Sequence, residues 1–358
     1  MESEIKEYMK SKFGMERFAK ESDVIPVFAQ NERKIVTIFV LRETIAPLID
    51  RSDDPESTIT FVMRLEDGEE REVVEVPARK FKSKEKLAGL RICRMFNAVD
   101  PGYEYNNVKE KSYLANPNSV IFGDSVVVGK DVGQAMLPSR VYYSSSYSIR
   151  SKSQITRQLV HNSLSEAGTM WDRDSGKNRT SLFNTEYIEP GTLLPSFISM
   201  RNPTPESLIH LILCLNETKY GAQTAITGPN VKNNIVALYF GEEELPVTSY
   251  TISRDLQGKV TDNLNKNDLM KLIMENAYDK MSSRNSGIMI SGKELDEFLM
   301  KIKNLSYEDL STVYKTLKKD ADDLIEYAKI NDSGKKSKKN KGNPISQGSD
   351  EVEKEQDV

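Results

Sequence analysis

The sequence predicts an α+β protein, and three segments carry that prediction. Residues 34–41 contain the mostly apolar, β-branched run IVTIFVL, which is typical of a central strand covered on both faces. Thr204 and Pro205 form a strong helix start, and apolar residues follow at helical spacing as far as Leu215. From Asn265 onward the chain has a helical pattern, so the sequence combines strands and helices in one chain.

The order of the remaining elements narrows the fold class. Asp67-Gly68 joins two strand-like runs and is a strong hairpin signal. In chain order we expect a strand at 34–41, the hairpin strands 58–65 and 69–76, a basic segment at 79–96 whose second half is a short helix, strands at 140–149 and 181–200, the helix after Thr204, and a strand at 235–240. Apart from the hairpin, this is the split βαβ or ferredoxin-like order, enlarged by insertions.

Composition divides the chain into an ordered part and a tail. We expect a helical segment at 1–20, a core at 21–250, a C-terminal helical subdomain at 251–331 and a disordered tail at 332–358. Within the core, residues 97–136 form an irregular insertion and residues 150–180 a long loop or hairpin. In the helical subdomain, residues 291–294 and 306–309 have the spacing of capping boxes.

Composition also excludes several classes of protein. Of the 358 residues, 38% are hydrophobic and 29% charged, with a net charge of −4, which is ordinary for a soluble chain. We expect neither a membrane span nor a signal peptide. Two cysteines give no disulfide framework and favour the reducing cytoplasm. With only two histidines and two cysteines, no zinc site is expected, and any metal would be a hard ion held by carboxylates.

A glycine-rich loop at 218–234 lies between the predicted helix and the strand at 235–240. It lacks the GxxxxGK[ST] spacing of nucleotide phosphate loops. Its glycines still permit close approach of the backbone to phosphates, and exposed N–H groups can form an anion nest. Alone, this loop is a weak signal for phosphate binding.

Basic residues cluster in two further places, the segment 79–96 and the turn-rich stretch 171–197. A cationic flap on a rigid sheet suits a long polyanion, although a charge run is equally typical of a solvated face. The candidate nucleic-acid contacts are Lys80, Lys82, Lys84, Lys86 and Arg91; Arg150, Lys152, Arg157, His161, Arg173, Lys177 and Arg179; and, in the glycine-rich loop, Lys219, Tyr220, Gly221, Gln223, Thr224, Gly228, Asn230 and Lys232.

Several motifs in series resemble one family. They are Phe122-Gly123-Asp124, Asn162-x-Leu164-Ser165-Glu166-x-Gly168-Thr169-Met170, Asp172-x-x-Ser175-Gly176-Lys177-x-Arg179, Glu186-Tyr187-x-x-Pro190-Gly191-Thr192-Leu193 and Tyr220-Gly221-Ala222-Gln223-Thr224-x-x-x-Gly228-Pro229-Asn230-Val231. The sequence resembles the RAMP superfamily, specifically the crRNA-binding backbone subunit of type I-D CRISPR effector (Cascade-like) complexes. The resemblance is dense over residues 120–240 and looser over 33–96.

This resemblance implies a modified RNA-recognition-motif fold in a subunit used for antiviral defence. Copies of such a subunit stack along one guide crRNA, together with other effector subunits, and the guide pairs with target DNA or RNA. A projecting hairpin, the thumb, interrupts that pairing and falls within residues 150–180. Type I-D relatives carry a cysteine-rich zinc insertion, but here the corresponding segment contains Cys93 alone, so we expect no zinc and no cofactor.

Two alternatives to a guide-RNA scaffold remain open. Related backbone subunits cut the paired strand with an acidic residue in a loop after the first strand, and Asp50, Asp53 and Asp54 occupy a comparable place. With Mg²⁺ a carboxylate here would act on a phosphate, whereas turn statistics favour a simple exposed turn at Asp53-Asp54-Pro55. A small-molecule enzyme or a protein-only adaptor has little support, because no nucleophile–base pair or cofactor fingerprint is present.

Overall fold

The computed structural model describes residues 4–20, 25–50, 58–65, 67–126, 135–162, 169–172, 174–178, 182–221, 228–257, 259–260, 264–282 and 287–328. The expected tail at 332–358 lies outside these residues.

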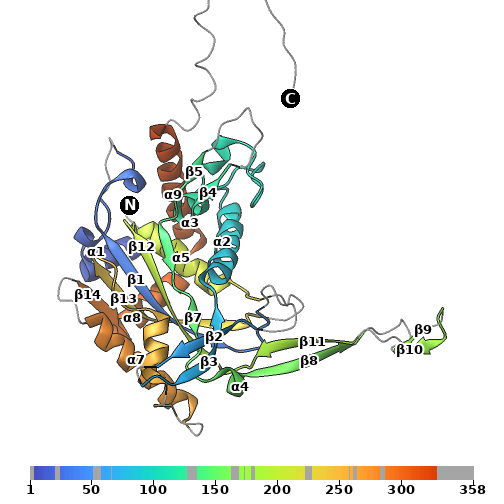
Figure 1. Ribbon diagram of the computed structural model, residues 1–358. Helices are drawn as coiled ribbons and strands as arrows, with labels where there is room; N and C mark the ends of the chain where they lie inside the picture. The colour runs from blue at the N-terminus through green and yellow to red at the C-terminus, as the bar shows by residue number, and fades with distance from the viewer. Residues whose placement is uncertain are drawn as a thin grey trace, which may run out of the picture.

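The centre of the protein is a five-stranded sheet in which every neighbouring pair is antiparallel (Figure 1). Ile38 in the central strand lies opposite Ile198 on one side and Leu238 on the other. The strands, in their order across the sheet, are β14 (Ile288–Ser291), β13 (Val231–Gly241), β1 (Ile35–Thr44), β12 (Leu193–Arg201) and β6 (Val141–Tyr143).

Two helices complete the predicted split βαβ order. Helix α2 (Ala78–Met95) precedes β6, and helix α5 (Pro205–Glu217) connects β12 to β13. The chain therefore runs β1-α2-β6-β12-α5-β13, with β1 and β12 in the middle of the sheet, and the ferredoxin-like fold class is confirmed. The predicted helix start is also correct, because the Thr204 side chain accepts a hydrogen bond from the Ser207 backbone N–H at 3.1 Å.

Helices cover the sheet on both faces, so β1 is buried along its whole length, as its apolar run predicts. Alternate residues of a strand point to opposite faces. Val36, Ile38 and Val40 belong to the larger core, whereas Phe39 and Leu41 belong to a second core on the other face. The first core is covered by α1 (Glu4–Phe13), α2, α3 (Pro117–Phe122), α5, α8 (Gly292–Lys303) and α9 (Tyr307–Tyr327), and the second by α6 (Ser249–Leu256) and α7 (Lys266–Ser282).

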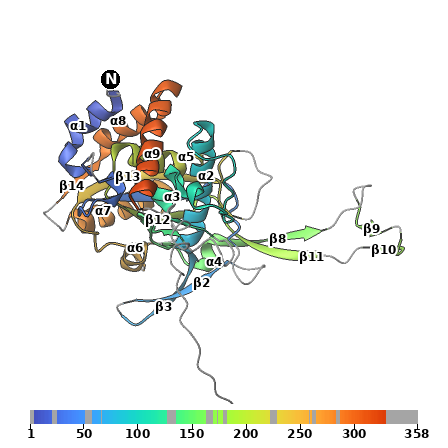
Figure 2. The ribbon, with the colours of Figure 1, turned by 90° about the horizontal axis from the view of Figure 1, so that it is seen from above.

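A two-stranded hairpin extends far from this body in both views (Figures 1 and 2). Strands β8 (Thr156–Asn162) and β11 (Leu182–Ile188) pair along seven residues each, and β9 (Trp171–Asp172) pairs with β10 (Lys177–Asn178) beyond them. We call residues 156–188 the hairpin arm. The arm overlaps the segment in which the resemblance implies a thumb.

Smaller elements surround the sheet. The strands β2 (Thr60–Arg64) and β3 (Glu70–Val76) form the predicted hairpin around Gly68. The others are η1 (Met15–Arg17), η2 (Val27–Ala29), η3 (Lys111–Leu114), β4 (Asp124–Ser125), β5 (Met136–Leu137), β7 (Ser146–Tyr147) and α4 (Lys152–Ile155).

Several predicted elements were wrong in extent. The strand expected at 181–200 is two strands, β11 in the arm and β12 in the sheet, because the chain turns at Pro190-Gly191. The basic segment is helical throughout as α2, because Phe81 and Glu85 in its first half are as buried as the apolar residues of its second half. The strand expected at 140–149 is the two short strands β6 and β7, and the insertion at 97–136 includes helix α3.

The C-terminal helices pack directly on the core. The hydroxyl of Tyr314 in α9 lies 2.8 Å from Nδ1 of the buried His210 in α5. Ser306 and Asp309 form the expected capping box, whereas the Ser291 side chain makes no capping hydrogen bond to the described residues. Among the described helices, none combines the length and apolar character needed to cross a membrane.

Candidate nucleic-acid interface

Three segments that are distant in sequence meet at the end of the sheet where β1 stops. The Thr44 backbone N–H donates to the Thr192 carbonyl at 3.0 Å, and the Thr44 carbonyl accepts from the Gly191 N–H at 2.6 Å. The Ile45 N–H donates to the Asn230 carbonyl at 2.9 Å. The base of the hairpin arm and the end of the glycine-rich loop are therefore both fixed to the end of β1. We call this region the sheet end.

The arm is anchored at the sheet end and exposed along its length. Leu48 pairs with Ile188 as an isolated bridge at the base. Farther out, Leu159 and Val160 are exposed, and because they are adjacent in β8 they lie on opposite faces of the arm. Trp171, close to the tip, is also exposed. An isolated hairpin in water is marginally stable, so these apolar side chains suit an arm that is covered by a partner.

A charged cluster fixes the direction in which the arm leaves the body. The Glu186 carboxylate accepts hydrogen bonds from the backbone N–H of Thr58 at 2.7 Å and from its hydroxyl at 2.6 Å. Lys152 Nζ lies 3.2 Å from the same carboxylate. Partial burial raises the pKa of Glu186, but the hydrogen bonds from Thr58 and Lys152 outweigh it and hold the pKa below its usual value. The arm is thus tied to the chain that precedes β2.

The two ends of the glycine-rich loop are tied to each other. The Tyr220 backbone N–H donates to the Asn230 side-chain oxygen at 2.9 Å, and the Asn230 side-chain amide donates to the Tyr220 carbonyl at 2.8 Å. Gly221 has a φ of +75°, and a Cβ there would lie 2.7 Å from the Ile49 carbonyl oxygen. Only glycine fits this close approach without strain. Gln223 and Thr224 lie outside the described residues.

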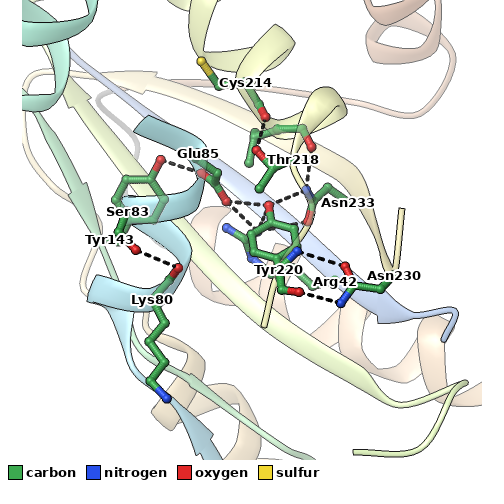
Figure 3. A network of polar contacts seen from close by, with 11 residues as sticks. Arg42, Lys80, Ser83, Glu85, Tyr143, Cys214, Thr218, Tyr220, Asn230 and Asn233 are labelled. Carbon is green, nitrogen blue, oxygen red and sulfur yellow. Dashed lines mark hydrogen bonds and ion pairs between the residues drawn. The ribbon is translucent and has the colours of Figure 1, made fainter. Parts of the chain in front are cut away.

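Below the loop, a fully buried ion pair joins β1 to α2 (Figure 3). Arg42 Nη1 lies 2.7 Å from Glu85 Oε1, and it also donates to the Tyr220 hydroxyl at 2.8 Å and the Asn233 side-chain oxygen at 2.9 Å. The Tyr220 hydroxyl donates to Glu85 Oε1 at 2.7 Å, and the Tyr143 hydroxyl donates to Glu85 Oε2 at 2.5 Å. We call Arg42, Glu85, Tyr220 and Asn233 the Arg42 network; Tyr143 contacts this network through Glu85 Oε2.

The lysines of α2 separate into two groups. Lys82 donates to the Ser139 hydroxyl at 2.7 Å, and Lys86 donates to the Gly123 carbonyl at 2.7 Å and lies 3.4 Å from Asp124. Burial lowers the pKa of both ammonium groups, that of Lys86 despite the nearby Asp124. These two lysines hold the neighbouring insertion against α2. Lys80 points away from the Arg42 network toward the sheet end, Lys84 is half-buried, and Arg91 is exposed.

The candidates on and near the arm are distributed from its base to its tip. At the base, Arg150 donates to the Leu264 carbonyl at 2.7 Å, and Arg157 lies 3.1 Å from the Glu189 carboxylate. Lys177 is exposed in β10. The backbone of His161 pairs with Phe183 in β11, while its side chain and the residues Arg173 and Arg179 lie outside the described part of the chain.

The glycine-rich loop contributes surface and support. Lys219, Gly228 and Lys232 are exposed, and Lys232 lies opposite Glu43 of β1 in the sheet register. Tyr220 and Asn230 are buried, so they support the loop from within. The candidate contacts around the sheet end are therefore Lys80, Lys152, Arg157, Lys219, Gly228 and Lys232.

The candidate acidic residue Asp50 also lies at the sheet end. It is 5% exposed, and its Oδ1 lies 2.7 Å from Lys80 Nζ. Burial outweighs the contact with Lys80 and raises the pKa of the Asp50 carboxyl. Asp53 and Asp54 lie outside the described residues, and the described histidines, cysteines and carboxylates contain no group of three that could hold a metal ion. The absence of a zinc site or cofactor stays a prediction.

Sequence reasoning missed most of the Arg42 network. Arg42 directly follows the apolar run of β1, where a charged residue in a central strand already signals a buried partner. Glu85 is the single acidic residue among the seven basic residues of segment 79–96, which is the matching signal on α2. Neither signal shows that the two residues meet.

The fold and the sheet end define a class: an α+β protein on a ferredoxin-like core whose sheet faces are both covered and whose hairpin arm leaves one end of the sheet. The sequence model of the Csc2 CRISPR family matches residues 22–317, and the chain belongs to that family. No curated protein sequence matches significantly.

The fold of one solved structure is similar, and two other solved chains match at lower scores. The crystal structure of Thermofilum pendens Csc2 is 13% identical, with a TM-score of 0.59, covering 89% of this chain and 98% of that one. A chain of a CRISPR RNA-guided surveillance complex is 10% identical, with a TM-score of 0.49 and coverage of 80% and 99%. A chain of such a complex before nicking is also 10% identical, with a TM-score of 0.46 and the same coverage.

Proposed function

We propose that this protein is the guide-binding backbone subunit of a type I-D, Cascade-like CRISPR effector complex, a RAMP protein that works in the cytoplasm in antiviral defence. One observation carries the proposal: in a member of the Csc2 family, the projecting arm and the glycine-rich loop are both fixed to the end of β1. An arm and a loop fixed together form a rigid site for an extended polymer, because neither can move without the other.

The sheet end binds the sugar-phosphate backbone of the crRNA and leaves the bases free. Lysines and arginines at the sheet end neutralise phosphates and release counterions, which gives sequence-independent affinity that falls steeply with salt. Gly228, where a Cβ would meet no atom within 4 Å, allows close approach of the backbone to a phosphate. Sequence is then read by pairing between the guide and the target DNA or RNA.

The arm connects successive copies of the subunit along the guide. Exposed apolar residues on both faces of a two-stranded arm favour contact with a second copy on one side and with the guide–target pair on the other. A contact between the arm of one copy and the body of the next is heterologous, so copies add head to tail and form a filament. Other effector subunits would bind the ends of that filament.

Purification of the protein with its operon partners tests this function. We expect a discrete short RNA to co-purify, and its dissociation constant should rise steeply between low and moderate salt. Protein that is free of nucleic acid and binds single-stranded RNA without salt dependence would contradict the proposal.

The alternative, that the same scaffold cuts the paired strand with Mg²⁺, rests on Asp50, Asp53 and Asp54. The Asp50 carboxylate already has the Lys80 ammonium as its counter-ion, so a metal ion would have to displace that lysine. We therefore propose the scaffold without nuclease activity and test the alternative separately.

A further inference from the structure

We propose that the Arg42 network is a positioning device for the glycine-rich loop, and that it sets how the loop ends contact nucleic acid. The inference rests on the proposed function, because it concerns the same binding surface. It assigns a role in binding to side chains that are themselves buried beneath that surface.

The network first fixes the Tyr220 side chain from three elements. The hydroxyl is 2.8 Å from Arg42 in β1, 2.7 Å from Glu85 in α2, and 2.7 Å from the side-chain amide of Asn233 in β13. Figure 3 shows these groups gathered around the Tyr220 hydroxyl. Three hydrogen bonds from different directions leave the ring one position relative to the sheet.

Tyr220 then transmits this position to the loop. Its backbone forms both hydrogen bonds with the Asn230 side chain, so the first and last residues of the loop move together. The next residue, Gly221, packs against the Ile49 carbonyl. A shift of the Tyr220 ring would therefore displace both described ends of the loop against the chain that follows β1.

The energetics of the pair favour positioning over stabilisation. A buried ion pair often gives no more stability than apolar residues of similar volume, because both charges lose their hydration. Here Arg42 Nε and Nη2 are buried and make no hydrogen bond to the described residues, and the guanidinium lies 4.0 Å from the centre of the Phe81 ring. A pair selected for stability alone would satisfy these donors, whereas directed hydrogen bonds to Tyr220 need only the atoms that this pair uses.

Arg42 and Tyr220 each keep one protonation state near neutral pH. Burial alone would lower the pKa of Arg42, but the adjacent Glu85 carboxylate outweighs it and raises the pKa. Burial, followed by the charge of Glu85, raises the pKa of the Tyr220 hydroxyl. Tyr220 thus remains a hydrogen-bond donor under physiological conditions.

The chain offers a matched pair of variants, because two tyrosines donate to the two oxygens of one carboxylate. Tyr220→Phe removes the hydroxyl that belongs to the loop, and Tyr143→Phe removes the hydroxyl that belongs to β6. Both changes remove a hydrogen bond to Glu85 and keep the Arg42–Glu85 contact, so both should lower the urea midpoint of unfolding. Tyr220→Phe should lower it further, because it also removes the hydrogen bonds from Arg42 and Asn233. Only Tyr220→Phe alters the loop.

Binding of a single-stranded oligouridylate, measured across a salt series, distinguishes positioning from stability. We expect Tyr220→Phe to weaken binding about tenfold, the factor that corresponds to about 1.4 kcal/mol. Its slope of log K against log salt should fall by about one, since roughly one phosphate contact is lost. Tyr143→Phe should keep the wild-type slope and an affinity within about twofold of wild type.

Equal binding by both tyrosine variants would overturn the inference while leaving the proposed function intact. Wild-type protein that does not bind RNA would instead contradict the proposed function. If Tyr220→Phe fails to fold, Asn230→Ala unlinks the loop ends without touching the ion pair and should reproduce the tenfold loss. If Asn230→Ala keeps the wild-type RNA affinity and the wild-type slope of log K against log salt, the proposed positioning role is refuted.

Discussion

Acidification should destabilise this protein through one buried histidine. The His210 side chain is fully buried in α5, where Nδ1 lies 2.8 Å from the Tyr314 hydroxyl and Nε2 lies 3.5 Å from Cys214 Sγ. Burial lowers the pKa of His210 to about 3. In the unfolded chain a histidine has a pKa of about 6.5, so below that value the unfolded state binds a proton that the folded state excludes.

The size of the effect follows from the two pKa values. Above about pH 6.5 the imidazole is neutral in both states, and it adds no pH dependence to the free energy of unfolding. Below that pH each unit of acidification costs about 1.4 kcal/mol, until the folded pKa is reached. At about pH 5 the loss attributable to His210 is therefore about 2 kcal/mol, a large fraction of the stability of a typical domain.

Urea unfolding of the wild type and of His210→Gln, at about pH 7.5 and about pH 5, measures this contribution. The variant loses the contact with Tyr314 at both pH values, but it has no proton to exclude. Because all other titrating groups are shared, the wild type should lose about 2 kcal/mol more than the variant on acidification. The same pH dependence in both proteins would refute the reasoning.

Three further predictions concern the proposed interface. Lys177→Glu should weaken RNA binding without changing the free energy of unfolding, whereas Lys86→Glu, which breaks a partly buried contact with Asp124, should lower that free energy by about 2 kcal/mol in urea titrations; the reverse pattern would contradict the assignment of Lys177 to the surface and of Lys86 to packing. Glu186→Gln should accelerate proteolysis of the arm relative to Glu189→Gln, since Glu186 accepts hydrogen bonds from Thr58 before β2 whereas Glu189 contacts Arg157 of the arm itself; equal rates would argue against that anchor. With Mg²⁺, the assembled complex should leave complementary RNA and single-stranded DNA uncut; regularly spaced products that disappear with Asp50→Ala would establish the nuclease alternative.

The elements that could be predicted from the sequence are those with local physical causes. The apolar run of β1 requires cover on both faces, and Thr204 caps α5 regardless of what the helix contacts. The split βαβ order followed from these elements in series. Each of these elements depends on residues within one turn or one strand.

What could not be predicted depends on contacts between distant segments. Strand β11 pairs with β8 rather than with the sheet, and its sequence suits either partner; the only local sign was the turn at Pro190-Gly191. Lys82 and Lys86 looked like surface cations because their partners, Ser139 and the Gly123–Asp124 segment, come much later in the chain. The charge pattern shows that segment 79–96 is basic, but it does not show which face of α2 the insertion covers.

The covered sheet explains why the proposed interface lies at the end of the strands. RNA-recognition motifs stack bases on aromatic residues of an open sheet face. Here Phe39 and Phe197 stack on each other, with ring centres 4.8 Å apart, within the core covered by α6 and α7, so these rings are not available for bases. The proposed contacts at the sheet end would come instead from lysines, arginines and glycine-rich backbone, which suit phosphates. The proposed guide scaffold would gain from losing the stacking face, because a base held on an aromatic ring would have to be released before it could pair.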